Sequence, residues 1–327
     1  MKQAFVLVAF LFSVVRVAAQ PVVYPSSFTV AQDGSGDFRT IQEAVNAVRD
    51  LSQQRVTIHI RKGVYREKLV IPSWKTMIAL VGDSRDSTII VYDDYSGKPN
   101  PGGRDAFGKE KFTTYTSYTV LVEGNDFSAE NLTIENAAGR VGQAVALHVE
   151  GDRCVIANCR LLGNQDTLYA GTEGSRQYYK NCFIEGTTDF IFGEATAVFD
   201  HCVIRSLTNS YIAAAATTPR QRFGFVFLDC RLVADTGAHK VFLGRPWRPF
   251  ARTVYIRTEM GEHIVPAGWD NWRNPQNEKT AYYAEYESAG PGAVAAKRVS
   301  WARQLSTDEA KTYSVDNILG EWVKGYE

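Results

Sequence analysis

The chain has 327 residues, which is enough for one large solenoid or two ordinary domains. Hydrophobic residues make up 45% of it, as in most soluble globular proteins. Lys plus Arg and Asp plus Glu number 36 each, so the formal net charge is zero. This balance provides no global basic field, and it excludes recruitment of nucleic acid or of an anionic membrane surface by overall charge.

The first 19 residues have the features of a secretory signal peptide. Lys2 supplies the positive charge, Ala4 to Val15 form the apolar stretch, and Val17-Ala18-Ala19 is a small-residue cleavage site. The apolar run is short and no second one follows, so a membrane anchor is not expected. We therefore expect a secreted protein, extracellular or periplasmic in a Gram-negative source, in which residues 20–327 form a single domain.

The first predicted helix lies close to this leader. Thr40-Ile41-Gln42-Glu43 is a capping box, and the apolar residues that follow predict a helix to about Leu51. At the start of a solenoid such a helix would cover the open edge. Ser306-Thr307-Asp308-Glu309 has the same capping signature and predicts a helix near the C-terminus.

Strands are predicted where apolar and β-branched residues alternate. The clearest early runs are residues 55–60, 89–92 and 118–122. Residues 93–117 between two of these runs are rich in Gly, Pro, Asp and Lys, which predicts a long excursion from the regular structure. No segment has the composition of a flexible linker between domains, so one elongated domain is expected.

An imperfect internal repeat follows the excursion. Each copy has a polar residue, a small or apolar residue, a variable position and an aliphatic residue; the copies begin at Asn131, Asn158, Asn181, His201 and Asp229. The second residues of successive copies are 27, 23, 20 and 28 positions apart. A period in this range, with β-branched and aromatic segments, predicts the stacked coils of a parallel β-helix.

Four of the five cysteines occupy the second position of the repeat, and the fifth is Cys154. They could pack as buried thiols, or pair as disulfides in an exported protein. Cys182 and Cys202 belong to adjacent coils with the shortest separation, although Cys159 with Cys182 suits disulfide geometry almost as well. The odd number of cysteines leaves at least one thiol unpaired in a monomer.

Two carboxylates fall at the same place in successive copies. Seven residues after the second repeat position stand Asp166 and Asp189, whereas the other copies have Gly or Asn there. Stacked coils lie roughly 4.8 Å apart, so the two side chains should be close neighbours. Like charges at that distance split their pKa values and provide one acid and one base or nucleophile. The alternative is a chance pair of turn residues.

Polar residues near this pair could serve acyl transfer. Gln165 precedes Asp166, and Gln143 lies 22 residues earlier, about one coil away. Their amides could donate to an oxyanion, or could only form a structural ladder. Arg245 could hold Asp189 ionised, or could be an ordinary surface residue. Several aromatic residues could form a sugar-binding groove or belong to the core: Tyr169, Phe192, Trp247, Trp269 and Trp272.

Several common catalytic patterns are absent from the sequence. There is no G-x-S-x-G elbow for a serine esterase and no H-E-x-x-H or Cys-x-x-Cys pattern for zinc. Asp33-Gly34-Ser35-Gly36-Asp37 resembles the start of a calcium loop, but Ala44 stands where the loop needs Glu. We therefore expect no metal and no organic cofactor.

Five segments of the chain closely resemble, in order, the five motifs of the pectin methylesterase family: residues 63–67 (GVYRE), 143–147 (QAVAL), 165–168 (QDTL), 189–193 (DFIFG) and 243–247 (LGRPW). The resemblance implies an all-β fold, a right-handed parallel β-helix with short capping helices at its N- and C-terminal ends. It also implies hydrolysis of the methyl esters of polygalacturonate (pectin), with release of methanol.

The same resemblance assigns roles to individual residues. It makes Asp189 the nucleophile and Asp166 the general acid/base, with Gln143 and Gln165 as oxyanion donors and Arg245 orienting Asp189. The residues that it places along the substrate are Thr114, Gln143, Tyr169, Phe192, Arg245, Trp247 and Trp269. Bacterial members with a disulfide between coils resemble this chain at Cys182 and Cys202. The expected state is a monomer without cofactor.

Three alternatives remain open at the level of the sequence. One is another pectin-acting β-helix enzyme, a lyase with calcium ligands or a glycosidase with a carboxylate pair. Neither predicts two Gln amides beside two Asp. A second is a carbohydrate-binding solenoid without catalysis, and a third is an esterase on the same scaffold that has lost its preference for pectin.

Overall fold

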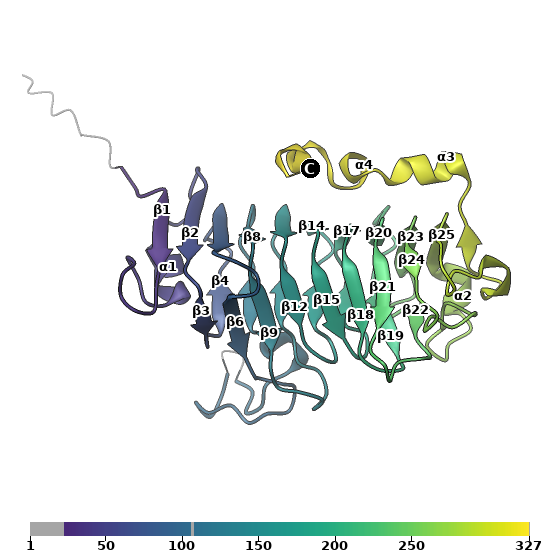
Figure 1. Ribbon diagram of the computed structural model, residues 1–327, viewed down its shortest axis with the longest axis horizontal. Coiled ribbons are helices and arrows are strands. Elements are labelled where there is room, and N and C mark those ends of the chain that lie inside the picture. Colours follow the sequence, from purple (N-terminus) through teal and green to yellow (C-terminus); the bar gives the residue numbers. More distant parts are fainter. Residues whose placement is uncertain (1–22, 106–107, 327) are drawn as a thin grey trace, which may run out of the picture.

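The computed structural model describes residues 23–105 and 108–326, and the predicted signal peptide therefore lies outside the described residues. The chain winds into a solenoid in which three sheets run along the long axis of the molecule (Figure 1). In the described ranges no helix is long and apolar enough to cross a membrane. The predicted parallel β-helix is confirmed.

The three sheets contain all the named strands. The 11-stranded sheet has the strands β1 Ser27–Val30, β2 Val56–Ile60, β5 Ile78–Gly82, β8 Ser128–Glu130, β11 Cys154–Ala157, β14 Arg176–Lys180, β17 Thr196–Asp200, β20 Phe225–Leu228, β23 Arg252–Ile256, β25 Tyr282–Tyr286 and β26 Arg303–Gln304. The 8-stranded sheet has β3 Gly63–Tyr65, β6 Thr88–Tyr92, β9 Thr133–Asn136, β12 Arg160–Leu162, β15 Phe183–Gly186, β18 Val203–Ser206, β21 Arg231–Ala234 and β24 Glu259–Met260. The 7-stranded sheet has β4 Leu69–Ile71, β7 Val120–Val122, β10 Leu147–Val149, β13 Leu168–Ala170, β16 Ile191–Gly193, β19 Tyr211–Ala215 and β22 Phe242–Gly244.

The repeat marks the corner at which each coil passes from the 11-stranded to the 8-stranded sheet. The polar residue of every copy has a positive φ, between 50° and 57°. Asn and Asp tolerate this left-handed conformation better than most residues, which explains the preference for them. Arg257 and Glu287, each with φ 48°, continue the same corner in two later coils. The sequence pattern missed these coils because neither residue is Asn, Asp or His.

The second residue of each copy points into the solenoid. Leu132 and the four cysteines that follow it in register are buried in one continuous core. Each of these thiols points at a backbone carbonyl of the preceding coil: Cys182 Sγ lies 3.3 Å from the Ile156 oxygen, and Cys202 Sγ 3.3 Å from the Tyr179 oxygen.

The predicted disulfide between Cys182 and Cys202 is not present, because all five cysteines are free thiols. A disulfide requires the two Cβ–Sγ directions to converge. In these in-register coils each thiol contacts a backbone carbonyl of the preceding coil, and no sulfur–sulfur bond joins them. Burial is the main cause that raises the pKa of both thiols well above its usual value, so they behave as apolar residues.

The predicted N-terminal helix is present and closes one end of the solenoid (Figure 1). Helix α1 spans Ile41–Ala47, and the capping box between Thr40 and Glu43 is formed. Its apolar face joins the main core. The helix is shorter than the predicted end at Leu51, because Val48 is already extended, with ψ 136°.

The C-terminal segment begins as predicted but takes a different path. Helix α3, Thr307–Ala310, starts at a complete capping box on Ser306. The chain then turns back and runs along the outer face of the 11-stranded sheet rather than across the end of the solenoid (Figure 1). Leu319 packs on this face, and Arg176 donates to its carbonyl at 3.1 Å. The remaining helices are η1 Thr114–Thr116, α2 Asn277–Thr280, η2 Ala295–Lys297, η3 Lys311–Tyr313, α4 Val315–Leu319 and η4 Glu321–Gly325.

Candidate active site

The two predicted aspartates lie in the same register of adjacent coils. Asp166 and Asp189 each precede a strand of the 7-stranded sheet by two residues, and the strand residues Leu168 and Ile191 are paired. Both aspartates have a positive φ, 66° for Asp166 and 49° for Asp189. Left-handed non-glycine residues are uncommon and concentrate at functional sites. The repeat therefore predicted the juxtaposition correctly.

Asp189 is held by a guanidinium group. Arg245, directly after β22, donates from Nε to Asp189 Oδ1 at 2.9 Å and from Nη2 to Asp189 Oδ2 at 2.6 Å. Such a fork fixes the orientation of the carboxylate. Burial raises the pKa of Asp189, and the hydrogen bonds and charge of Arg245 oppose that rise. The pair therefore favours the ionised carboxylate in a site that otherwise disfavours charge.

Asp166 has a different environment. Its side chain is 8% exposed, and its carboxyl group makes no hydrogen bond with the described residues. Burial first, and the charge of Asp189 second, raise the pKa of Asp166 to about 8. The raised pKa favours the protonated form of Asp166, whereas the hydrogen bonds and charge of Arg245 favour the ionised form of Asp189. The two carboxylates thus have different environments, as a pair with split pKa values requires.

Gln143 and Gln165 lie next to the carboxylates. They are partners in an isolated parallel bridge, and both line the same pocket as the two aspartates. Within the described ranges neither side-chain amide makes a hydrogen bond, although both backbone carbonyls do. A structural ladder would use these amides internally. Their free N–H groups are instead available to a group that enters the pocket.

The pocket above these side chains has a volume of about 230 Å³. This is room for an ester group and part of a ring rather than for a whole polymer. Its walls come from the 7-stranded sheet, from η1 and from the loops after β22: Thr114, Tyr115, Gln143, Gln165, Asp166, Asp189, Phe192, Ala214, Arg245, Trp247 and Trp272.

Aromatic side chains form one side of the pocket. Tyr169 and Phe192 are stacked, with their ring centroids 4.7 Å apart, and Trp247 meets the edge of Phe192 at 5.8 Å. Phe192, Trp247 and Thr114 line the pocket as predicted, whereas Tyr169 lies behind Phe192. Tyr115, which the sequence did not single out, lies over Tyr169 at 5.5 Å.

The prediction that Trp269 lines the cleft is wrong. Trp269 is 1% exposed and stacks on Tyr283, with the ring centroids 4.3 Å apart, inside the solenoid. Trp272, three residues later, lines the pocket instead. Only the turn between the two tryptophans decides which of them faces outward, and the sequence does not reveal that turn.

The loop that carries Thr114 and Tyr115 is closed at its neck by two side chains. Lys68 Nζ donates at 2.6 Å both to Asp94 Oδ2 and to the Thr116 carbonyl. Asn136 Nδ2 donates to the carbonyls of Asp94 and Ser117, at 2.9 and 3.1 Å. These contacts tie the two ends of the predicted excursion together. They hold one wall of the pocket against the solenoid.

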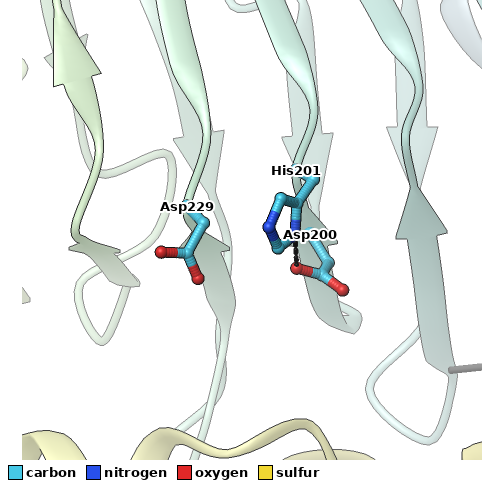
Figure 2. Close-up of side chains that lie close together, drawn as sticks. All are labelled: Asp200, His201 and Asp229. Atoms are coloured by element: carbon cyan, nitrogen blue, oxygen red, sulfur yellow. Dashed lines mark hydrogen bonds and ion pairs between the residues drawn. The ribbon is translucent and has the colours of Figure 1, made fainter.

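A second group of ionisable residues lies away from the pocket, at the repeat corners of two coils (Figure 2). Asp200, His201 and Asp229 come close enough together to suggest a metal site. However, Asp200 already accepts from His201 Nδ1 and from the Tyr178 hydroxyl, both at 2.6 Å. Both oxygens of Asp229 accept from Arg257. Protein donors thus satisfy each carboxylate, and the group is a hydrogen-bonded network that includes the ion pair between Asp229 and Arg257.

The comparisons with known proteins agree with this geometry. A family model described as Pectinesterase matches residues 27–321. Pectinesterase 31 of Arabidopsis thaliana is 40% identical over 283 residues, which cover 86% of this chain and 88% of the relative. Pectinesterase 5 of the same plant is 39% identical over 316 residues, and these span only 51% of its length.

Solved structures give the same result. Pectin methylesterase from carrot superposes with a TM-score of 0.83 and 36% identity, covering 94% of this chain and 97% of its own. Pectin methylesterase from Aspergillus niger has a TM-score of 0.79 and 28% identity, covering 95% of this chain and 99% of its own. The chain therefore belongs to the pectinesterase family of carboxylic ester hydrolases.

Proposed function

We propose that the protein removes methyl groups from methylated polygalacturonate by hydrolysing the ester and releasing methanol. One observation carries the catalytic assignment: of two buried carboxylates in the same register, only Asp189 is held by Arg245, and only Asp166 has its pKa raised to about 8. Asp189 is the nucleophile and Asp166 is the general acid and base.

In the first half of the reaction, an oxygen of Asp189 attacks the carbonyl carbon of the methyl ester. The carbonyl oxygen becomes an oxyanion, which accepts hydrogen bonds from the amides of Gln143 and Gln165. When this tetrahedral intermediate collapses, the carbon–oxygen bond to the methoxy group breaks. Asp166 gives its proton to the departing oxygen, so methanol leaves and an anhydride joins Asp189 to the sugar acid.

In the second half, water enters the place that methanol has left. Asp166, now ionised, takes a proton from the water as its oxygen attacks the anhydride. The bond to Asp189 breaks, the sugar carboxylate is released, and both aspartates return to their starting states. Arg245 keeps the charge of Asp189 aligned in both halves.

Methylated pectin is the substrate class that the relatives support. Their printed names are those of pectin methylesterases, and one such enzyme was solved in complex with a hexasaccharide (TM-score 0.77, 29% identity). The side chains of Tyr115 and Trp247, which line the pocket and are not buried, offer apolar faces on which sugar rings can stack. The proposed partner is therefore the polymer itself.

The setting of the enzyme is also a proposal. The signal-like residues 1–19 support secretion, and the neutral net charge supports neither a nucleic-acid nor a membrane partner. The two carboxylates, Arg245 and the two Gln amides suffice for the proposed acyl transfer, and the proposed enzyme is a monomer that acts without metal or organic cofactor.

The test compares two substrates at equal ester concentration. Methanol release from highly methylated pectin should greatly exceed hydrolysis of a simple aryl acetate. Equal rates on both would favour the esterase that has lost its pectin preference. Binding of pectin without any release of methanol would favour the non-catalytic solenoid.

A further inference from the structure

Arg245 lies between two aromatic rings. Its Cζ atom is 3.9 Å from the centroid of the Tyr211 ring and 3.6 Å from that of the Trp272 ring. Two rings so close to one atom on the same side would touch each other. The ring contacts of the described residues include none between Tyr211 and Trp272. The rings therefore flank the guanidinium plane on its two faces.

Each ring is held in place by its own surroundings. The Tyr211 ring stacks on Phe242 of the next coil, with the centroids 5.3 Å apart. The Tyr211 carbonyl also accepts from the backbone N–H of Asp189 at 2.9 Å. This residue thus contacts both partners of the ion pair, Asp189 by its backbone and Arg245 by its ring.

Trp272 is presented by a strained turn. Trp272 and Arg273 both have φ 56°, a conformation that non-glycine residues rarely adopt in succession. The Trp272 N–H donates to Asp270 Oδ1 at 2.7 Å, and Asn271 is tied by its side chain to Glu278 and by its carbonyl to Asn277. Several contacts thus maintain this strained turn, and the turn fixes the position of the Trp272 ring.

A second carboxylate, that of Asp270, makes the position of the Trp272 ring important for Arg245. Asp270 lines a small pocket together with Tyr211, Arg245 and Trp272, so its carboxylate is a second anion beside the guanidinium. An unrestrained guanidinium could share its donors between Asp270 and Asp189. Because the N–H groups of Arg lie in the guanidinium plane, rings on both faces leave only the edge free, and that edge meets Asp189.

We propose that Trp272 and Tyr211 are positioning residues, which clamp the guanidinium of Arg245 so that both of its donors stay on Asp189. This inference rests on the proposed function, in which Asp189 is the nucleophile. Neither ring needs to touch the reacting atoms for this role. In this role the two rings act on the reaction through Arg245.

The first test compares Trp272→Ala, Trp272→Phe and a control, Trp247→Ala, in full kcat and KM profiles against pH. Loss of the ring in Trp272→Ala should lower kcat about tenfold and move the acid limb of kcat upward by about one pH unit, because Asp189 loses part of the hold of Arg245. Trp272→Phe should restore most of the lost kcat and most of the shift of the acid limb. Trp247→Ala should raise KM without moving the acid limb.

The groups that face Asp189 are Asp166, Asp270, Arg245 and Tyr283, and none of them is altered in these variants. A uniform drop in kcat in Trp272→Ala, with an unmoved acid limb, would overturn the clamp. So would equal losses in Trp272→Ala and Trp272→Phe.

The second test is a double-mutant cycle with Arg245→Lys, which cannot form the two-donor fork. If Trp272 acts through Arg245, Trp272→Ala should cost little further activity in the Arg245→Lys background. Fully multiplicative losses would contradict the proposal.

The clamp can also be tested without any turnover. Titration of ¹³C-labelled aspartate side chains by NMR should show the Asp189 pKa higher in Trp272→Ala than in the unaltered protein. An unchanged Asp189 pKa would reject the clamp. A folded, unaltered protein that releases no methanol from pectin would instead reject the proposed function, while this titration would still decide the clamp.

Discussion

Asp166 and Asp189 are equivalent in register and differ in one contact: Arg245 donates two hydrogen bonds to Asp189, and no described residue donates to the carboxyl group of Asp166. Both are nearly buried, so burial alone cannot separate their roles. The guanidinium makes the difference, because it stabilises charge on one carboxylate and leaves the other to keep a proton. The asymmetry that the proposed roles of acid and nucleophile require is therefore built by a single side chain.

Asp189→Asn should lower turnover on methylated pectin by several orders of magnitude, because an amide cannot form the anhydride. Methanol release by the purified variant is the measurement, with circular dichroism to show that the fold is intact. Asp200→Asn, which changes an equally hydrogen-bonded carboxylate outside the pocket, should retain normal turnover. Near-normal methanol release by a folded Asp189→Asn variant would remove Asp189 from the mechanism.

Turnover should decline above about pH 8, where Asp166 loses the proton that it donates to methanol. The same shift affects stability. The folded pKa of Asp166 lies above the value of about 3.9 in an unfolded chain, so between these values the folded state binds more protons and its stability falls as the pH rises.

Asp166→Asn removes this titration. The melting temperature of the variant minus that of the unaltered protein should therefore be higher at pH 9 than at pH 5, by roughly 2–4 °C or more. Thermal unfolding at the two pH values measures the gain. A constant difference between the two proteins would show that the Asp166 pKa is not raised. The variant should also lose nearly all turnover.

Gln143→Ala and Gln165→Ala should each lose about 10²–10³ in kcat, the usual cost of removing one oxyanion donor. The free amides of both residues motivate this expectation. The melting temperature should change little, because neither amide forms a hydrogen bond with the described residues. Unchanged kcat together with a lower melting temperature would instead identify these residues as a structural ladder.

All five cysteines should react with a thiol reagent in denaturant and none of them in the native protein, because all are buried free thiols and burial raises the pKa of Cys154 to about 12. Thiol counts on unreduced protein, followed by mass mapping of peptides, give the result. Three reactive thiols, together with a peptide that links Cys182 to Cys202, would show that the disulfide expected from the sequence does form.

The sequence predicted the coil and the centre of the site because both depend on register. A left-handed corner and an inward second residue recur in every coil, so the repeat locates Asp166 and Asp189 without tertiary information. The position of Trp272 could not be obtained in this way, since one strained turn sets it.

The path of the C-terminal segment was also hidden from the sequence. It depends on an apolar outer face of the 11-stranded sheet, which in the sequence cannot be distinguished from core. The cysteines show the same limit: the repeat correctly predicts that they share one buried column, but a shared column does not determine whether two thiols form a disulfide.

We propose that the enzyme cleaves the side ester and leaves the polymer intact, without a metal. The direct measurement follows methanol, new carboxylates and polymer length together on methylated polygalacturonate in a strong chelator. We expect methanol and carboxylate to appear in equal amounts at an undiminished rate, with constant chain length and no unsaturated sugar ends. Loss of activity in the chelator together with depolymerisation in its absence would contradict the account and favour a calcium-dependent lyase.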